Sequence, residues 1–328
     1  MAIVLSIQHL PKMTLNPIAV LNEPRKTRVP YELKQGQSRV FHQLPSGLNM
    51  EVIVQKSVKE KNPESRKDPP LVFVHGSYHS AWCWAEHWLP FFSNSGFDCF
   101  ALSLLGQGES DTPSGTVAGS LQMCEFSTIY NRFRADADIN SAALICSVPP
   151  SGNSGLVWRY LFSKPIAAFK VTRSLAAKAF QTSLSLCRET FFSATMEDNL
   201  ARMLQKNNES EQHSLIEGYK SSYQNNISHL LRKSYQELMK ESSRVPLFDL
   251  RKLNESLPVP KMTACSTEIL VLGAKDDFIV DAEGLNETGR FYNVTPICIE
   301  GVAHDMMLDC SWGEGANVIL SWLNGLNR

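Results

Sequence analysis

The sequence predicts an α/β fold with a mostly parallel sheet flanked by helices. Residues 71–74, LVFV, form an unbroken apolar run, which is typical of a parallel strand covered on both faces. Helical apolar spacing follows over residues 81–92, and a second apolar strand is expected over residues 97–104, so the three elements have the lengths of a βαβ unit. Near the other end, residues 268–272 and 294–300 repeat the buried-strand pattern.

The region before this unit divides into an extension and a strand pair. Up to residue 30, four Lys and Arg residues stand against a single acid, Glu23, and no strong strand or helix pattern is found. We interpret residues 1–30 as an N-terminal extension, either an organellar transit peptide or a plain disordered segment. Residues 39–44 and 51–55, joined by a Pro-Ser-Gly turn, are expected to open the sheet, and residues 56–70 form a charged loop.

The strand at residues 71–74 ends at His75 and Gly76. A turn at this place can point backbone N–H groups at an oxygen on which negative charge develops, and Ser77 and Tyr78 would carry those donors. The alternative is an ordinary strand-to-helix turn in which His75 is a structural hydrogen-bonding residue.

Residues 70–110 resemble the plant and bacterial branch of the α/β-hydrolase superfamily. They contain an HGxxxxxWxW opening, HGSYHSAWCW, and a GxGxS turn, GQGES. The resemblance implies that the catalytic acid follows the strand at 268–272 and that the general base follows the strand at 294–300. It therefore implies that His304 is the base and that Asp277 is the acid, with Asp276 as the alternative.

The resemblance also implies a nucleophilic serine in a G-x-S-x-G turn between the Gly106 turn and the late strands, and no such motif is present. The nearest look-alike, residues 151–155, has the wrong glycine spacing and is interpreted as a loop leaving a strand. About 35 residues separate Gly108 from the strand at 142–148, whereas the missing elements need roughly 50 or more. A central strand and most of its helix are therefore missing or replaced, and we expect unpaired strand edges and poor folding.

Three residues lie near the right place in chain order to replace the serine: Cys124, Ser127 and Cys146. A thiolate can in principle replace the alkoxide. None of the three is in an elbow context, so each is interpreted as structural, and Cys146 as a small core hydrophobe.

The chain is divided into residues 31–148 and 263–328, the two parts of the hydrolase core, and residues 149–262, a helical cap with a polar insertion. Trp158 and Phe162, with Tyr160 and Phe169, are candidates for an apolar pocket that accepts an acyl or aromatic group. The favoured alternative is that these aromatic residues pack the cap against the core.

Composition excludes several classes of function. A net charge of -1 gives no argument for nucleic-acid binding, and no apolar run approaches the ~18 residues of a membrane span. The eight cysteines show no CxxC spacing, so we expect reduced thiols in an intracellular compartment, chloroplast or cytoplasm, and neither a metal nor an organic cofactor.

Two functions remain. The first is a protein that resembles serine carboxylic-ester hydrolases, with a small acyl or aromatic substrate, but is catalytically impaired. The second is a non-catalytic α/β-hydrolase-like binding protein or an incomplete splice isoform. Lyase chemistry like that of hydroxynitrile lyases would need the same absent serine.

Overall fold

A computed structural model shows how the chain folds. It describes residues 2–7, 15–16, 31–59, 69–113, 139–163, 165–194, 196, 235–242, 247 and 267–326. The predicted polar insertion at 199–234 and both Cys124 and Ser127 lie outside these ranges.

The described strands form one mixed sheet, and the predicted α/β class is confirmed. Its order is β2-β3-β4-β6-β5-β1-β7-β8-β9. The pairs β5–β6, β7–β8 and β8–β9 are parallel. The strands are β1 (Ala2–Ile7), β2 (Leu15–Asn16), β3 (Gln37–Gln43), β4 (Asn49–Gln55), β5 (Leu71–Val74), β6 (Cys99–Leu102), β7 (Ile139–Ile145), β8 (Glu268–Ala274) and β9 (Ile297–Ile299).

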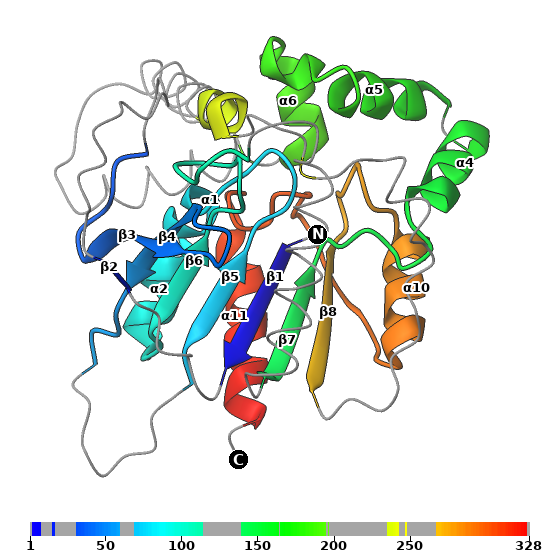
Figure 1. Cartoon of the computed structure of the whole chain (residues 1–328). Helices are drawn as coiled ribbons and strands as arrows, with labels where there is room; N and C mark the ends of the chain where they lie inside the picture. Colours follow the sequence, from blue (N-terminus) through cyan, green and yellow to red (C-terminus); the bar gives the residue numbers. More distant parts are fainter. Residues whose placement is uncertain are drawn as a thin grey trace, which may run out of the picture.

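The centre of the sheet is occupied by the very start of the chain. Strand β1 lies between β5 and β7 (Figure 1) and is antiparallel to both: Leu5 is in register with Val72 on one side and with Ala142 on the other. The prediction that no strand precedes Tyr31 is therefore wrong. The expectation of unpaired edges is also wrong here, because β1 supplies backbone partners to both neighbours.

Strand β1 is buried on both faces, as a central strand must be. Ala2 and Val4 belong to the core on one side of the sheet, whereas Ile3, Leu5 and Ile7 belong to the core on the other side. This alternation follows from the two-residue period of a strand. The transit peptide remains a prediction, and removal of residues 1–30 would take β1 out of the sheet.

Helices cover the sheet and its upper edge. Helix α2 (Trp88–Ser95) contacts β6 and α11 (Trp312–Leu326), and α10 (Ala282–Tyr292) contacts β8. Above the sheet edge in Figure 1 lie α4 (Asn153–Ser163), α5 (Pro165–Leu175) and α6 (Leu184–Phe191), with the short helix η1 (Ala179–Gln181) between the last two. No helix among the described residues is long and apolar enough to cross a membrane.

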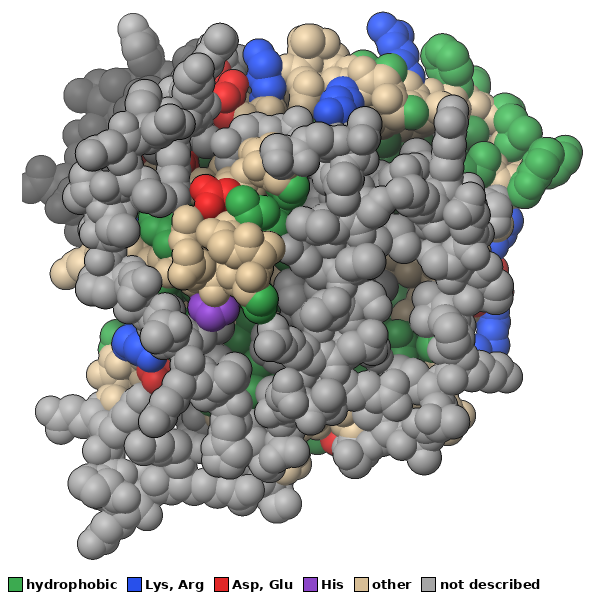
Figure 2. Space-filling model, in the orientation of Figure 1, with side chains coloured by type: hydrophobic (Ala, Val, Ile, Leu, Met, Phe, Trp, Pro, Cys, Tyr) green, Lys and Arg blue, Asp and Glu red, His purple; other side chains and the backbone are tan. Residues whose placement is uncertain are grey.

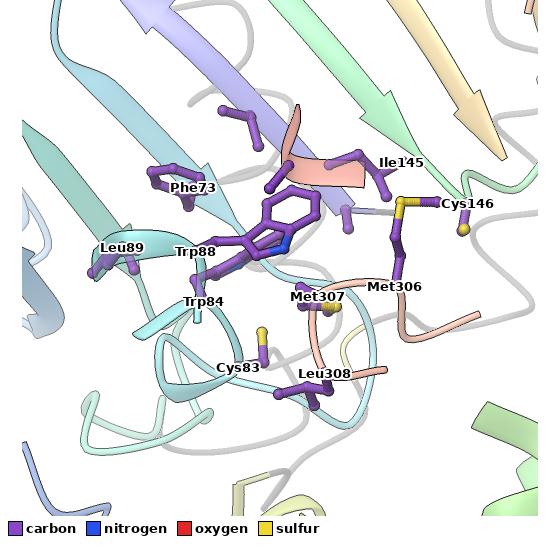
Figure 3. Packing of buried hydrophobic residues seen from close by; sticks show 14 of the residues in the cluster. Phe73, Cys83, Trp84, Trp88, Leu89, Ile145, Cys146, Met306, Met307 and Leu308 are labelled. Atoms are coloured by element: carbon purple, nitrogen blue, oxygen red, sulfur yellow. The ribbon is translucent and has the colours of Figure 1, made fainter. Parts of the chain in front are cut away.

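An aromatic cluster fills the core on the α2 side. The rings of Phe73 and Trp84 lie 5.5 Å apart, and those of Trp84 and Trp88 lie 5.3 Å apart. Figure 3 shows these rings with Met307 and Leu308 from the segment that follows His304. The aromatic HGxxxxxWxW opening therefore builds core, and it fixes the loop that carries the histidine.

Several predicted boundaries shift. The helix expected over 81–92 is two helices, α1 (Trp82–Ala85) and α2, because the backbone of His87 is not helical. Residues 151–155 are not only a loop, since α4 begins at Asn153. The division into a core and a cap at residues 149–262 remains a prediction.

Candidate active site

The structure brings together the two residues that were predicted to act as base and acid. His304 follows β9 and Asp277 follows β8, and these strands are parallel neighbours whose carboxyl ends reach the same edge of the sheet. The Nδ1 atom of His304 lies 2.9 Å from Oδ2 and 3.0 Å from Oδ1 of Asp277. An Nδ1–H that donates to this carboxylate leaves Nε2 free to accept a proton.

The local backbone fixes the carboxylate of Asp277. Its Oδ1 accepts the backbone N–H groups of Ile279 at 2.7 Å and Val280 at 2.9 Å, an Asx turn that orients the side chain. Neighbouring Asp276 is exposed, and its backbone N–H donates to the carbonyl of Val302. The structure therefore places Asp277, and not Asp276, against His304.

His75 has a structural role in the loop after β5. Its Nε2 accepts the backbone N–H of Leu104, so the proton is on Nδ1, which donates to the carbonyl of Gly76. Burial lowers the pKa of His75 to about 3, so the ring is neutral. These two hydrogen bonds connect the turn after β5 to Leu104, just after β6, and they fix the backbone that leads into Ser77 and Tyr78.

Ser77 and Tyr78, the predicted oxyanion-hole donors, are partly exposed. Tyr78 has a positive φ of 67°, uncommon for a residue with a side chain. Its hydroxyl donates to the carbonyl of Leu175 at 2.9 Å. Among the described residues, neither backbone N–H of this pair donates a hydrogen bond, so both are available to an anionic oxygen.

A second histidine–aspartate pair connects this loop to the histidine loop. His79 Nε2 lies 3.0 Å from Oδ2 of Asp305, and both side chains are buried. His79 Nδ1 faces the carbonyl of Ser77 at 2.9 Å, so each ring nitrogen has an acceptor. Burial lowers the pKa of His79, but the charge and hydrogen bond of Asp305 outweigh burial, and the pKa is raised overall. Sequence reasoning missed this pair, although His79 lies within the HGSYHSAWCW motif and Asp305 directly follows His304.

Buried Asp309 joins the histidine loop to Ser193, which follows α6. Its Oδ2 accepts the backbone N–H groups of Ser193 and Ala303, and its Oδ1 accepts the Ser193 hydroxyl. Ala303 immediately precedes His304, so this carboxylate fixes the backbone directly before the histidine. No sequence motif indicated this role.

Cys146 lies beside the acid and base. Donor atoms of Cys146, Asp277 and His304 fall within 4.8 Å of one another, close enough to be considered for a metal. The direct hydrogen bond between the carboxylate and the imidazole already accounts for two of these groups. Burial raises the pKa of the Cys146 thiol well above its ordinary value, and the charge of Asp277 adds to the effect. The thiol is thus held in its weakly nucleophilic form.

Ala2 occupies the position between β5 and β7 at the edge of the sheet where these two strands end. This residue is in register with Ile145, whose successor is Cys146. Because β1 is antiparallel, the chain enters the sheet at this edge and cannot continue from there into a strand-to-helix turn. Ala2, the first described residue of this strand, carries no nucleophilic group.

Trp158 and Phe162 lie on the surface of helix α4. They are 58% and 79% exposed, and their rings stack 5.7 Å apart. Tyr160, in the same helix, is half-buried. The role of Trp158 and Phe162 as pocket residues remains a prediction.

The mixed sheet with helices packed on it has the α/β-hydrolase fold. In agreement, residues 69–147 match the model of a family described as alpha/beta hydrolase fold, Abhydrolase_1. The chain also resembles the crystal structure of a putative lipase from Acinetobacter baumannii AYE, with 15% identity, a TM-score of 0.50, and coverage of 89% of this chain and 92% of the lipase. Epoxide hydrolase VrEH1 from Vigna radiata matches with 13% identity, a TM-score of 0.46, and coverage of 90% and 100%. At these identities the likeness concerns the fold alone. No curated protein matches the sequence.

Proposed function

We propose that this chain is a catalytically impaired relative of serine carboxylic-ester hydrolases that binds a small acyl or aromatic molecule. The observation that carries the proposal is the identity of the central strand. Strand β1 pairs with both β5 and β7 in place of a strand that would lead into a nucleophile turn. Ala2 supplies no nucleophile at that edge.

The rest of the site supports binding. His304 and Asp277 form a polarised pair, and the backbone N–H groups of Ser77 and Tyr78 face no acceptor among the described residues. Together they offer hydrogen bonds to a carbonyl or carboxylate oxygen, the groups that an acyl ligand carries. The pair can orient a ligand, but without an attacking group it cannot form an acyl-enzyme.

A fluorophosphonate tests the proposal, because it modifies activated serines whatever the natural substrate is. We expect the intact mass of the folded chain to remain unchanged while an active serine hydrolase in the same tube is labelled. A single adduct that His304→Ala abolishes would contradict the proposal, since it would identify a working nucleophile.

A second experiment addresses the thiol. Iodoacetamide on the folded chain should modify exposed Cys298 before buried Cys146, whose raised pKa keeps it protonated. Preferential labelling of Cys146, lost in His304→Ala, would instead identify a cysteine nucleophile and would also overturn the proposal.

A further inference from the structure

The cap carries an exposed apolar face on α4 and α5. Six large side chains lie there: Val157, Trp158, Leu161, Phe162, Ile166 and Phe169, between 48% and 79% exposed. In Figure 2 hydrophobic side chains gather at the upper right, over these two helices. Together they form a large exposed apolar patch, which is rare on a monomer and marks an interaction site.

An ordinary surface helix buries its apolar side, whereas α4 and α5 expose large apolar side chains. The inward sides of α4 and α5 make polar contacts instead. Arg159 donates two hydrogen bonds to Asp281 of the loop before α10, at 2.7 and 2.8 Å. Lys170 pairs with Glu189 of α6 at 2.6 Å, and Ser174 is buried against Thr190. Leu156 and Leu175 also pack inward, so the six exposed side chains are apolar surface beyond what these helices use to pack on the protein.

The helices of the face carry basic residues, whereas the acids near them lie on other elements. Residues 151–178 contain five Lys or Arg residues and no Asp or Glu. Two of the five, Arg159 and Lys170, are neutralised by their partners from other elements. Arg173 lies four residues after Phe169 and seven after Ile166, on the same side of α5. Among the described residues of α5, Arg173 therefore places a positive charge beside the apolar face without an ion pair.

From these observations we infer that the α4–α5 face docks onto a lipid bilayer that carries anionic headgroups. Trp, Phe and Ile side chains on one side of a helix, with Lys and Arg and no acids beside them, are the composition of a helix that lies in a membrane interface. The basic residues of these helices complement the negative charge of such headgroups. The docking lays the cap on the bilayer without crossing it, and it requires no chemistry at His304.

Vesicle flotation of the full chain tests the inference. We compare phosphatidylcholine vesicles with vesicles in which part of the phosphatidylcholine is replaced by phosphatidylglycerol. Binding should be stronger on the anionic vesicles and should fall as salt is added. The double variant Phe162→Asp/Phe169→Asp should bind at least ~10-fold more weakly, because each ring loses its apolar burial. Arg173→Gln should weaken binding to the anionic vesicles by about 5-fold.

Val58→Asp is the matched control, because Val58 is 64% exposed but follows β4, away from the cap; it should bind as the wild type does. Should the double variant lose its cooperative melt, Phe162→Ser alone gives the same test. The inference is overturned if the wild type floats with neither vesicle, if the double variant binds unchanged, or if light scattering shows a dimer that Phe162→Ser abolishes. The last result would assign the face to a second copy of the chain.

Discussion

The strand at the start of the chain gives the sharpest prediction about stability. Leu5 is 6% exposed and lies in register with Val72 and Ala142, in the middle of the sheet. Leu5→Ala should therefore behave as a core truncation. Ile297→Ala is the matched control, since Ile297 lies in edge strand β9 and is 41% exposed.

The two substitutions should lower the free energy of unfolding by amounts that differ several-fold. Leu-to-Ala changes in a packed core cost roughly 2–5 kcal/mol, because the lost transfer free energy adds to the cost of the cavity. At Ile297 less apolar area returns to water and no closed cavity forms, so the loss should stay below about 1 kcal/mol. With denaturant slopes of a few kcal/mol per molar, Leu5→Ala should lower the urea midpoint by on the order of 1 M.

Tryptophan fluorescence during urea unfolding measures both midpoints, because buried Trp84 and Trp88 report on the core. Hydrogen exchange adds a direct test: the amides of Val4 and Leu5 should be protected like those of β7. If Leu5→Ala and Ile297→Ala shift the midpoint equally, or if these amides exchange freely, β1 is not part of the folded sheet. A sharp melt is now expected, in contrast to the molten behaviour that an empty centre would cause.

Three further predictions concern the site. Asp305→Asn should cost about 3–5 kcal/mol, because it leaves the buried charge of His79 without its partner. The raised pKa of His79 means that its contribution to the free energy of unfolding is complete below about pH 6.5 and is lost as pH rises through the folded pKa. Urea midpoints of the wild type should therefore fall over that range more than those of His79→Gln, and equal slopes would refute this. Gly108→Ala should lower the melting temperature more than Gly47→Ala: both have positive φ, but a Cβ at Gly108 would lie 2.5 Å from Oε2 of Glu51, whereas Gly47 has nothing within 4 Å.

Local sequence patterns predicted the parts of the fold that rest on local physics. The apolar runs at β5 and β8 and the turn at Gly106 are visible because a buried parallel strand needs such residues and a tight turn needs glycine. The pairing of His304 with Asp277 was foreseen because both follow adjacent parallel strands. The His79–Asp305 pair was not, since only the fold places these residues together.

The central strand could not be predicted for the same reason. Residues 2–7, AIVLSI, have the apolar composition of a buried strand. No local sequence pattern indicates, however, that they pair with the strands around residues 72 and 142. Sequence reasoning grouped them with the basic stretch that follows and expected an extension. Long-range pairing depends on which edges are left open elsewhere in the chain, and a local pattern carries no such information.

The direction of β1 separates stability from catalysis. A parallel strand between β5 and β7 would leave the sheet at the carboxyl edge, beside His304, and could turn there into a helix that presents a nucleophile. An antiparallel strand satisfies the same backbone groups and buries the same two faces, yet it leaves the sheet at the opposite edge. The sheet can thus be complete in hydrogen bonds and packing while Ala2, at the edge beside His304, supplies no nucleophile. On this argument the sheet should be stable, which Leu5→Ala tests, and the chain should stay unmodified by a fluorophosphonate, which tests the proposed loss of the nucleophile.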